Sequence, residues 1–301
     1  MDGRCVNGGS DREKRNGWTG RNHGKVVVNT DNRTASPVFL FAAGWRSGST
    51  LLQRLIISSG QVLMWGEAGG ALNTLHDTAE RYAQMVGPGN VAFRHGMGGS
   101  GGDSLKNFRE KGEAGVHEWI ACMNMPEEAI YSGLRSFFDH IYSDPAAEMG
   151  YPRWGVKEVI SGVETARFLR ALYPSAKFVF LVRDPFACLL SLKRRRWLSG
   201  TVKDRPVVYF SELWRDLASG FREADFGFYL RYEDLISDDR TLEKLQEYLE
   251  IEGLSLDFVR SSHADWKTAD RRTLTFRETF TARRILKDEM RRHHYPLDQR
   301  T

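Results

Sequence analysis

The sequence predicts an α/β fold in which helices cover both faces of a central, mainly parallel β-sheet. Short apolar runs rich in strand-forming residues alternate with longer segments whose apolar residues recur at helical spacing. Such alternation implies right-handed crossovers between parallel strands. The run at 178–182 is apolar throughout, as expected for a parallel strand buried on both faces.

Composition limits the class of protein. With 301 residues, 41% of them hydrophobic, the chain can build one large domain. The formal net charge of +4 favours an anionic ligand in a local pocket over a nucleic-acid surface. Three widely spaced cysteines argue against a disulfide framework or a zinc site. No apolar run reaches the ~20 residues of a membrane span and no signal peptide is evident, so we expect a cytoplasmic protein.

The first half of the chain contains a tail and two strand–helix pairs. Residues 1–36 are polar and glycine-rich and predict a disordered tail, followed by a single domain at 37–301. Strands are expected at 38–43 and 62–65, each followed by a helix, the second helix at 71–85. The glycine-rich segment 87–103 is either a substrate-gating loop or a mobile insert.

The second half continues the alternation. A helix is expected at 127–142, with Pro126 at its start, and strands at 153–159 and 178–182 enclose a helix at 163–172. Asp184 should then cap a helix that has Pro185 at its first position. The remaining expected elements are a helix at 206–223, a strand within 226–235, a helix carrying three leucines, an irregular stretch at 255–277 and a helix at 278–292.

The loop after the first strand has the composition of an anion site. It reads GWRSGSTLL from Gly44, and a strand, a glycine-bounded turn and a helix start together present free backbone N–H groups to an anion. Gly48 allows close approach, and Arg46 adds a planar fork of donors suited to phosphate or sulfate. The triphosphatase loop G-x-x-x-x-G-K-[ST] does not match, because Ser49 stands where its lysine would be.

This string resembles the 5′-phosphosulfate loop of sulfotransferases that use 3′-phosphoadenosine 5′-phosphosulfate (PAPS), in the arginine-type variant of the tyrosylprotein, carbohydrate and many bacterial members. The resemblance implies a three-layer, P-loop-like fold and transfer of a sulfuryl group to an acceptor hydroxyl without a metal, leaving 3′-phosphoadenosine 5′-phosphate (PAP). The residues that it implies around the 5′-phosphosulfate are Gly44, Arg46, Ser47, Gly48, Ser49 and Thr50.

A second motif, LVRDPFACLLSLKRR, resembles the family's 3′-phosphate signature. There, an arginine at a strand end is followed eight positions later by a helix serine, the separation between Arg183 and Ser191 here. Arg183 would leave the strand tip beside the anion loop while Ser191 lies two turns into the next helix. A dianion could be held between them, and this second phosphate site distinguishes the donor from ATP.

Two further residues are implied to be catalytic. Glu67 follows the second strand, twenty-one residues after Arg46, where related bacterial and tyrosylprotein enzymes carry a glutamate base. Lys157 resembles the K-[DE]-P lysine that contacts the bridging or sulfuryl oxygens, although Val159 replaces the proline. Glu158 is expected to be structural, paired with a nearby cation, and is also the reserve base. His95 and His117 are the candidates if the chain uses the histidine base of the cytosolic branch.

Other positions keep their alternatives open. Tyr232, in the family-like string YEDL, is either an adenine contact or a core residue. The R-K-G loop of the cytosolic branch is missing, and its replacement could be Arg271, Arg272 or Arg277. The acceptor is expected to be a small metabolite or a glycan. The alternatives are the tyrosine of a peptide, a P-loop small-molecule kinase and a non-catalytic basic binding module.

Overall fold

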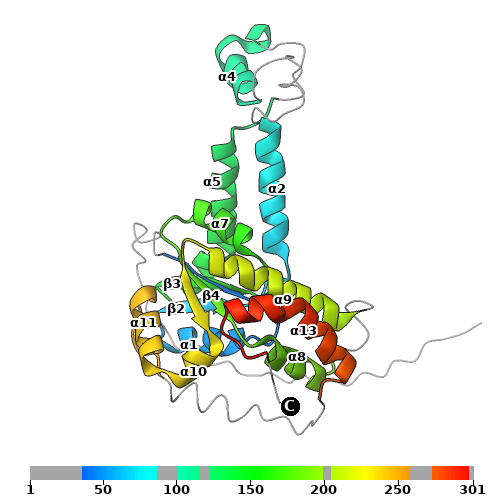
Figure 1. Cartoon of the computed structure of the whole chain (residues 1–301). Helices are drawn as coiled ribbons and strands as arrows, with labels where there is room; N and C mark the ends of the chain where they lie inside the picture. The colour runs from blue at the N-terminus through cyan, green and yellow to red at the C-terminus, as the bar shows by residue number, and fades with distance from the viewer. Residues whose placement is uncertain are drawn as a thin grey trace, which may run out of the picture. The chain divides into compact units, whose positions relative to one another are not determined.

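A sheet of five parallel strands, in the order β2-β3-β1-β4-β5, forms the centre of the part of the chain that the structure describes (Figure 1). The structure is a computed structural model and describes residues 36–86, 101–115, 123–198, 205–255, 257 and 273–297. All four strand pairings are parallel, which confirms the prediction of a mainly parallel sheet. The strands are β1 (Val38–Ala42), β2 (Val62–Trp65), β3 (Arg153–Glu158), β4 (Lys177–Val182) and β5 (Phe228–Arg231).

The strand order places a crevice at the carboxyl ends of β1 and β4. These two strands are neighbours, with Leu40 opposite Val179, but the chain leaves them in opposite directions, from β1 toward β2 and from β4 toward β5. Ligands of open α/β sheets bind where connections diverge in this way. The two predicted anion motifs follow β1 and β4, so the fold brings them to one place.

Helices cover both faces of the sheet, giving three layers. Residues of β1 alternate between the faces, as the pleat of a strand requires. Leu40 lies in the core beneath α1 (Ser49–Ser58), α10 (Tyr232–Ser237) and α11 (Asp239–Leu249). Phe39 and Phe41 lie in the opposite core, beneath α7 (Val163–Leu172), α9 (Pro206–Glu223) and α13 (Phe276–Arg292).

Local capping explains where several helices begin. The Asp184 carboxylate accepts hydrogen bonds from the N–H groups of Phe186 and Ala187 at the start of α8 (Pro185–Arg194), as predicted. A capping box between Thr275 and Glu278 begins α13 two residues earlier than the periodicity predicts.

The segment between β2 and β3 differs most from the prediction. Helix α2 (Ala71–Val86) packs beside α5 (Glu127–Phe138), and both pack on α7 (Figure 1). The helix predicted at 127–142 continues through a π-helical turn at Asp139–Ser143 into α6 (Asp144–Glu148). The last three residues of the segment predicted as a loop at 87–103 are helical, because α4 spans Gly101–Lys111; a 3₁₀ turn then spans Gly112–Gly115.

Several expectations lie outside the described residues. They are the disordered tail except for Ser36, the glycine-rich segment at 87–100, most of the irregular stretch at 255–277, and the candidates His95, His117, Arg271 and Arg272. Within the ranges that are described, no helix combines the length and the apolar character needed to cross a membrane.

Candidate active site

The loop after β1 is tied to both neighbouring strands before it turns. The Ala43 N–H donates to the Leu181 carbonyl at 2.9 Å and the Gly44 N–H to the Val159 carbonyl at 3.1 Å. The turn itself uses positive φ angles at Gly44 (78°), Arg46 (65°) and Gly48 (89°). A positive φ at a non-glycine residue is uncommon and strained, and such strain concentrates at functional sites.

Helix α1 begins with donors that its own chain leaves open. The N–H groups of Leu51 and Leu52 both donate to the Gly48 carbonyl, and no side chain caps the helix. The N–H groups of Ser49 and Thr50 have no hydrogen-bond partner within the described ranges. Unpaired donors at a helix start, together with the helix dipole, form an anion site.

Tyr232 lies directly on this loop. A Cβ atom at Gly48 would lie 2.2 Å from Tyr232 Cδ2, so only glycine fits beneath the ring. The Arg183 guanidinium lies over the same ring, 4.3 Å from its centroid. Tyr232 is only 5% exposed. It therefore packs between the loop and Arg183, whereas its contact with adenine stays a prediction.

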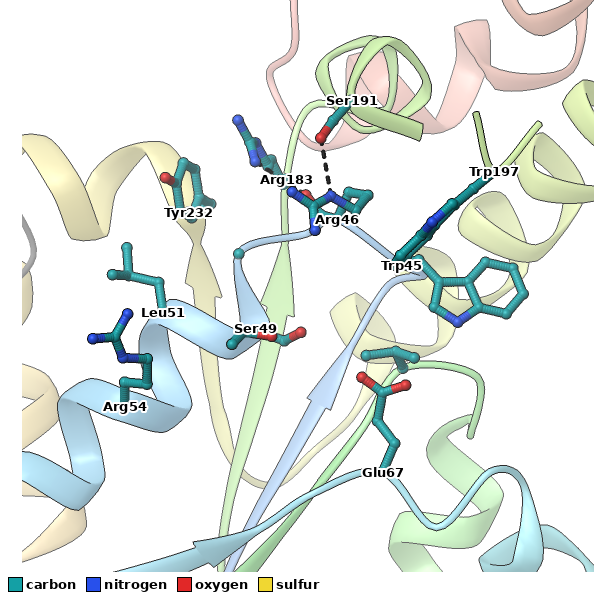
Figure 2. Close-up of a pocket in the computed structure, with 13 residues that line it drawn as sticks. Trp45, Arg46, Ser49, Leu51, Arg54, Glu67, Arg183, Ser191, Trp197 and Tyr232 are labelled. Atoms are coloured by element: carbon teal, nitrogen blue, oxygen red, sulfur yellow. Dashed lines mark hydrogen bonds between the residues drawn. The ribbon is translucent and has the colours of Figure 1, made fainter. Parts of the chain in front are cut away.

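Three predicted anion-binding residues meet beside the loop. Arg46 Nε donates to Ser191 Oγ at 2.9 Å, and Arg183 Nη1 donates to the Arg46 carbonyl at 3.0 Å (Figure 2). Burial, followed by the nearby charges of Arg195 and Arg183, lowers the pKa of Arg46. The crowding of like charges means that a bound anion would relieve repulsion here.

Arg183 is held by contacts on its main chain. Its carbonyl accepts a hydrogen bond from Trp214 Nε1 at 3.0 Å. The next N–H group, of Asp184, donates to Glu233 Oε1 at 3.0 Å, and Tyr295 Oη donates to Glu233 Oε2 at 2.9 Å. The partners in these contacts are 31 to 62 residues apart in the sequence, so no local pattern reveals them.

The two predicted catalytic residues of the β2–β3 side form an ion pair. Lys157 Nζ lies 2.7 Å from Glu67 Oε1. The lysine side chain is 6% exposed and the glutamate side chain 36% exposed, so the pair has a buried half and an open half. The more exposed partner is Glu67, and it is the one that lines the cavity described below.

Glu158, the reserve base, is buried behind this pair. Its Oε1 accepts a hydrogen bond from the Ala68 N–H at 2.8 Å, while Oε2 has no partner in the described part of the chain. Burial is the main cause that raises the pKa of Glu158; the Ala68 N–H opposes that rise and the Glu67 charge adds to it. The residue is 1% exposed and does not line the cavity.

A cavity of about 240 Å³ joins these groups (Figure 2). Its wall contains most of the predicted site residues: Arg46, Gly48, Ser49, Thr50, Glu67, Arg183, Ser191 and Tyr232. Gly44, Ser47 and Lys157 are not part of that wall. Ser47 is fully buried and its hydroxyl has no described partner, so it does not reach the cavity as a donor.

Five lining residues lack a predicted role: Trp45, Leu51, Arg54, Val159 and Trp197. Arg54 could have been predicted, since it follows Thr50 by four positions on α1 and therefore lies on the same face of the helix. The same spacing argument does not identify Leu51. Trp197, 53% exposed, had none; Arg46 lies 5.7 Å from its ring centroid. In Figure 2 Glu67 and Trp45 lie on one side of the loop, and Leu51, Arg54 and Tyr232 on the other.

Comparisons with known proteins identify a family. The model of the sulfotransferase family matches residues 37–255. Similar solved structures include a mouse sulfotransferase, SULT7A1, complexed with PAP (11% identity, 85% of this chain and 84% of that chain, TM-score 0.44). Another is a sulfotransferase from Alicyclobacillus acidocaldarius (14% identity, 87% of this chain and 98% of that chain, TM-score 0.42). A third is a shikimate kinase from Bacteroides thetaiotaomicron (17% identity, 71% of this chain and 98% of that chain, TM-score 0.33). No curated protein matches the chain.

Proposed function

Since this chain belongs to the sulfotransferase family, we propose that it transfers a sulfuryl group from PAPS to a hydroxyl group of a small metabolite or glycan. One observation carries the proposal: a single cavity is lined by the open helix start, by two arginines from neighbouring strand ends and by the Glu67 carboxylate. The cytoplasmic location expected from the sequence stays a prediction.

The residues of the cavity suit the two anionic ends of the donor. The open N–H groups of Ser49 and Thr50 and the Arg46 guanidinium would hold the 5′-phosphosulfate. Arg183 and Ser191 would hold the 3′-phosphate. When bound, PAPS supplies a sulfuryl group on a phosphate leaving group. Arg46 would place positive charge near the leaving oxygen, which gains negative charge during transfer. Lys157, implied by the sequence for the same task, is paired with Glu67 and does not line the cavity, so its proposed part is to hold Glu67.

Glu67 is proposed as the general base. The acceptor oxygen must lose its proton as it attacks sulfur, and a carboxylate within hydrogen-bond reach of that hydroxyl can take the proton. Glu67 Oε1 lies 2.7 Å from Lys157 Nζ, which fixes the side chain, and the residue lines the cavity that the acceptor would enter. After transfer the proton lies on a carboxyl oxygen of Glu67, from which solvent can remove it.

Two alternatives stay behind this proposal. Sulfation of peptide tyrosine uses the same donor and base, so only the acceptor differs. A P-loop kinase would need a lysine at the position of Ser49 to contact the transferred phosphate. That position is a serine at the start of α1.

The direct test is transfer of label from [³⁵S]PAPS to panels of sugars, phenols, aliphatic alcohols and tyrosine peptides, with PAP release measured in parallel. We expect labelled ester and PAP in equal amounts with at least one sugar or small alcohol. Labelling of the peptides alone would select the tyrosine alternative. Phosphorylation of the same panels by Mg·ATP, without transfer from PAPS, would contradict the proposed function.

A further inference from the structure

The last two residues of β3 both reach the loop that follows β2. We propose that Glu158 is a positioning residue, which fixes the backbone of this loop so that Glu67 faces the cavity and pairs with Lys157. The proposal rests on the proposed role of Glu67 as base. From the sequence, Glu158 is expected to be structural through a nearby cation, or to be the reserve base. The proposal gives it a defined structural partner instead, the Ala68 N–H.

The strand register explains why Glu158 can act on this loop. Strands β2 and β3 are paired up to Trp65 and Val156, where regular hydrogen bonding ends. Beyond that point the strand contacts are replaced by two side-chain contacts to consecutive residues, Lys157 to Glu67 and Glu158 to Ala68. The loop is thus held in two places, once through the side chain of the base and once through the adjacent backbone N–H.

The composition of the loop makes the second contact important. Ala68 lies between Gly66 and the pair Gly69 and Gly70, and both of the latter have positive φ angles. Glycine leaves the backbone unusually free, so a restraint is needed for a defined position. Ala68 provides it, because its N–H donates to Glu158 and its carbonyl accepts from the Ala71 N–H at the start of α2.

The burial of Glu158 is costly for stability alone. One carboxylate oxygen is buried without a described partner, and an incompletely paired buried charge destabilises a fold. A glutamine could accept the Ala68 hydrogen bond without that cost. The charged groups that face Glu158 are Lys157 on the same strand and Glu67 on the loop, with Tyr142 of the π-helical turn also nearby.

The experiment separates the position of Glu67 from the stability of the fold. Selective ¹³C labelling of glutamate carboxyl groups, with the Glu67 signal assigned by its loss in Glu67→Gln, reports the surroundings of that carboxylate. Lys157→Met gives the reference signal of an unpaired Glu67. Glu158→Met removes the acceptor at similar volume, and Glu158→Gln keeps it. We expect Glu158→Met to move the Glu67 signal at least halfway to the Lys157→Met value, and Glu158→Gln to leave it within a tenth of that span.

Activity provides the second readout. A displacement of about 1 Å can reduce turnover by ~10²-fold, so we expect Glu158→Met to lower kcat ~10- to 100-fold and Glu158→Gln to stay within about threefold of the parent. The Kd for PAP should change less than about twofold in both, because the anion loop follows a different strand. Tyr248→Phe is the matched control: it also removes a side-chain acceptor of a backbone N–H, that of Phe178 in β4, on the far side of β1 from β3.

Three outcomes would overturn the proposal. The Glu67 signal could stay unmoved in Glu158→Met, or Glu158→Met and Glu158→Gln could change the signal and kcat equally. The third is that Tyr248→Phe changes the signal and kcat as much as Glu158→Met does. If Glu158→Met does not fold, Ala68→Pro removes the donor from the opposite side of the contact. Failure of the proposed function has a different signature. Glu67→Gln would then keep full turnover, or PAP would not bind, while the Glu67 signal still responded to Glu158→Met.

Discussion

At the scale of single residues, the two arginines of the site are connected to each other and to Ser191 by hydrogen bonds. Arg183 donates to the carbonyl of Arg46, whose guanidinium donates to Ser191, so each of the three predicted anion-binding residues positions another. Substitution of one residue therefore has two consequences, the loss of its own ligand contact and the disturbance of its neighbour. To separate these two effects, a variant must be tested with two ligands that differ only in the group that the substituted residue would bind.

PAP and adenosine 5′-phosphate form such a pair, because only PAP carries the 3′-phosphate. Arg183→Ala should weaken PAP binding about 10- to 100-fold, the ~1.5–3 kcal/mol of a charge-assisted hydrogen bond. Binding of adenosine 5′-phosphate should weaken far less, since the open N–H groups of α1 remain. Isothermal titration of both nucleotides measures the difference. Equal losses would mean that Arg183 acts only by holding the loop through the Arg46 carbonyl.

Glu67→Gln tests the base. Glutamine keeps the shape of the side chain and can still accept from Lys157, but it is not basic. Turnover should fall by the ~10²–10⁴ typical of lost general-base catalysis. The Kd for PAP should barely change, because the anion loop is untouched. Initial rates of PAP release, with nucleotide titrations alongside, provide the measurement.

The result also decides what is tested next. Turnover of Glu67→Gln within a few-fold of the parent would remove Glu67 from the role of base. Glu158, His95 and His117 would then be replaced one at a time. Weakened PAP binding together with lower turnover would instead indicate that Glu67 holds the loop in place.

At the scale of elements, the sequence predicted what local chemistry determines. Strand β2 and helix α9 have the predicted bounds, and the Asp184–Pro185 pair begins α8 as expected. Errors occurred where the local signal was weak. Glycines at 101 and 102 favoured a loop, yet they begin α4. The boundary between α5 and α6 is a π-helical turn, which has no simple periodic signature.

Among the elements, the loop between β1 and α1 depends most on a single glycine. At Gly48, alanine would combine an unfavourable positive φ with overlap of the Tyr232 ring. Gly48→Ala should lower the free energy of unfolding by about 2–5 kcal/mol, from ~1–2 for left-handed backbone and ~1–3 for overpacking. It should also weaken PAP binding. Chemical unfolding and nucleotide titration measure both effects.

Gly60→Ala is the matched control for this prediction. Gly60 also has a positive φ, of 71°, but an added Cβ there meets nothing within 4 Å. It should therefore show the backbone cost alone, with unchanged nucleotide affinity. Equal effects of the two substitutions would mean that the Tyr232 contact does not matter.

At the scale of the whole molecule, the candidate site depends on strand order, which no local pattern reveals. The sequence identified residues at the ends of β1, β2 and β4 because each lies beside a strand and a turn. It could not show that Trp197 lies beneath Arg46, or that Glu233 and Tyr295 brace the strand end at Asp184. Those contacts join elements that become neighbours only after the sheet has formed.

The fold gathers positive charge around the cavity, which affects whether a bound nucleotide needs a metal ion. The positive groups around the cavity are protein groups: Arg46, Arg183, Arg54 and the start of α1. They can neutralise phosphate charge in the way that Mg²⁺ does in kinases, so PAP should bind without added metal. At a concentration of 100 times Kd, PAP should stabilise the folded state by ~2.7 kcal/mol, and thermal unfolding should shift upward by several degrees.

Thermal unfolding with PAP, adenosine 5′-phosphate and ATP, each with Mg²⁺ or with EDTA, measures this. The shift caused by PAP should be the same in both conditions, because the arginines and the helix start are present in both. Adenosine 5′-phosphate should give a smaller shift, since it leaves Arg183 and Ser191 without a phosphate. Stabilisation by Mg·ATP alone would require a metal to complete the charge of the site. That result would favour the kinase alternative over a sulfotransferase that binds the 5′-phosphosulfate and the 3′-phosphate of PAPS at separate sites.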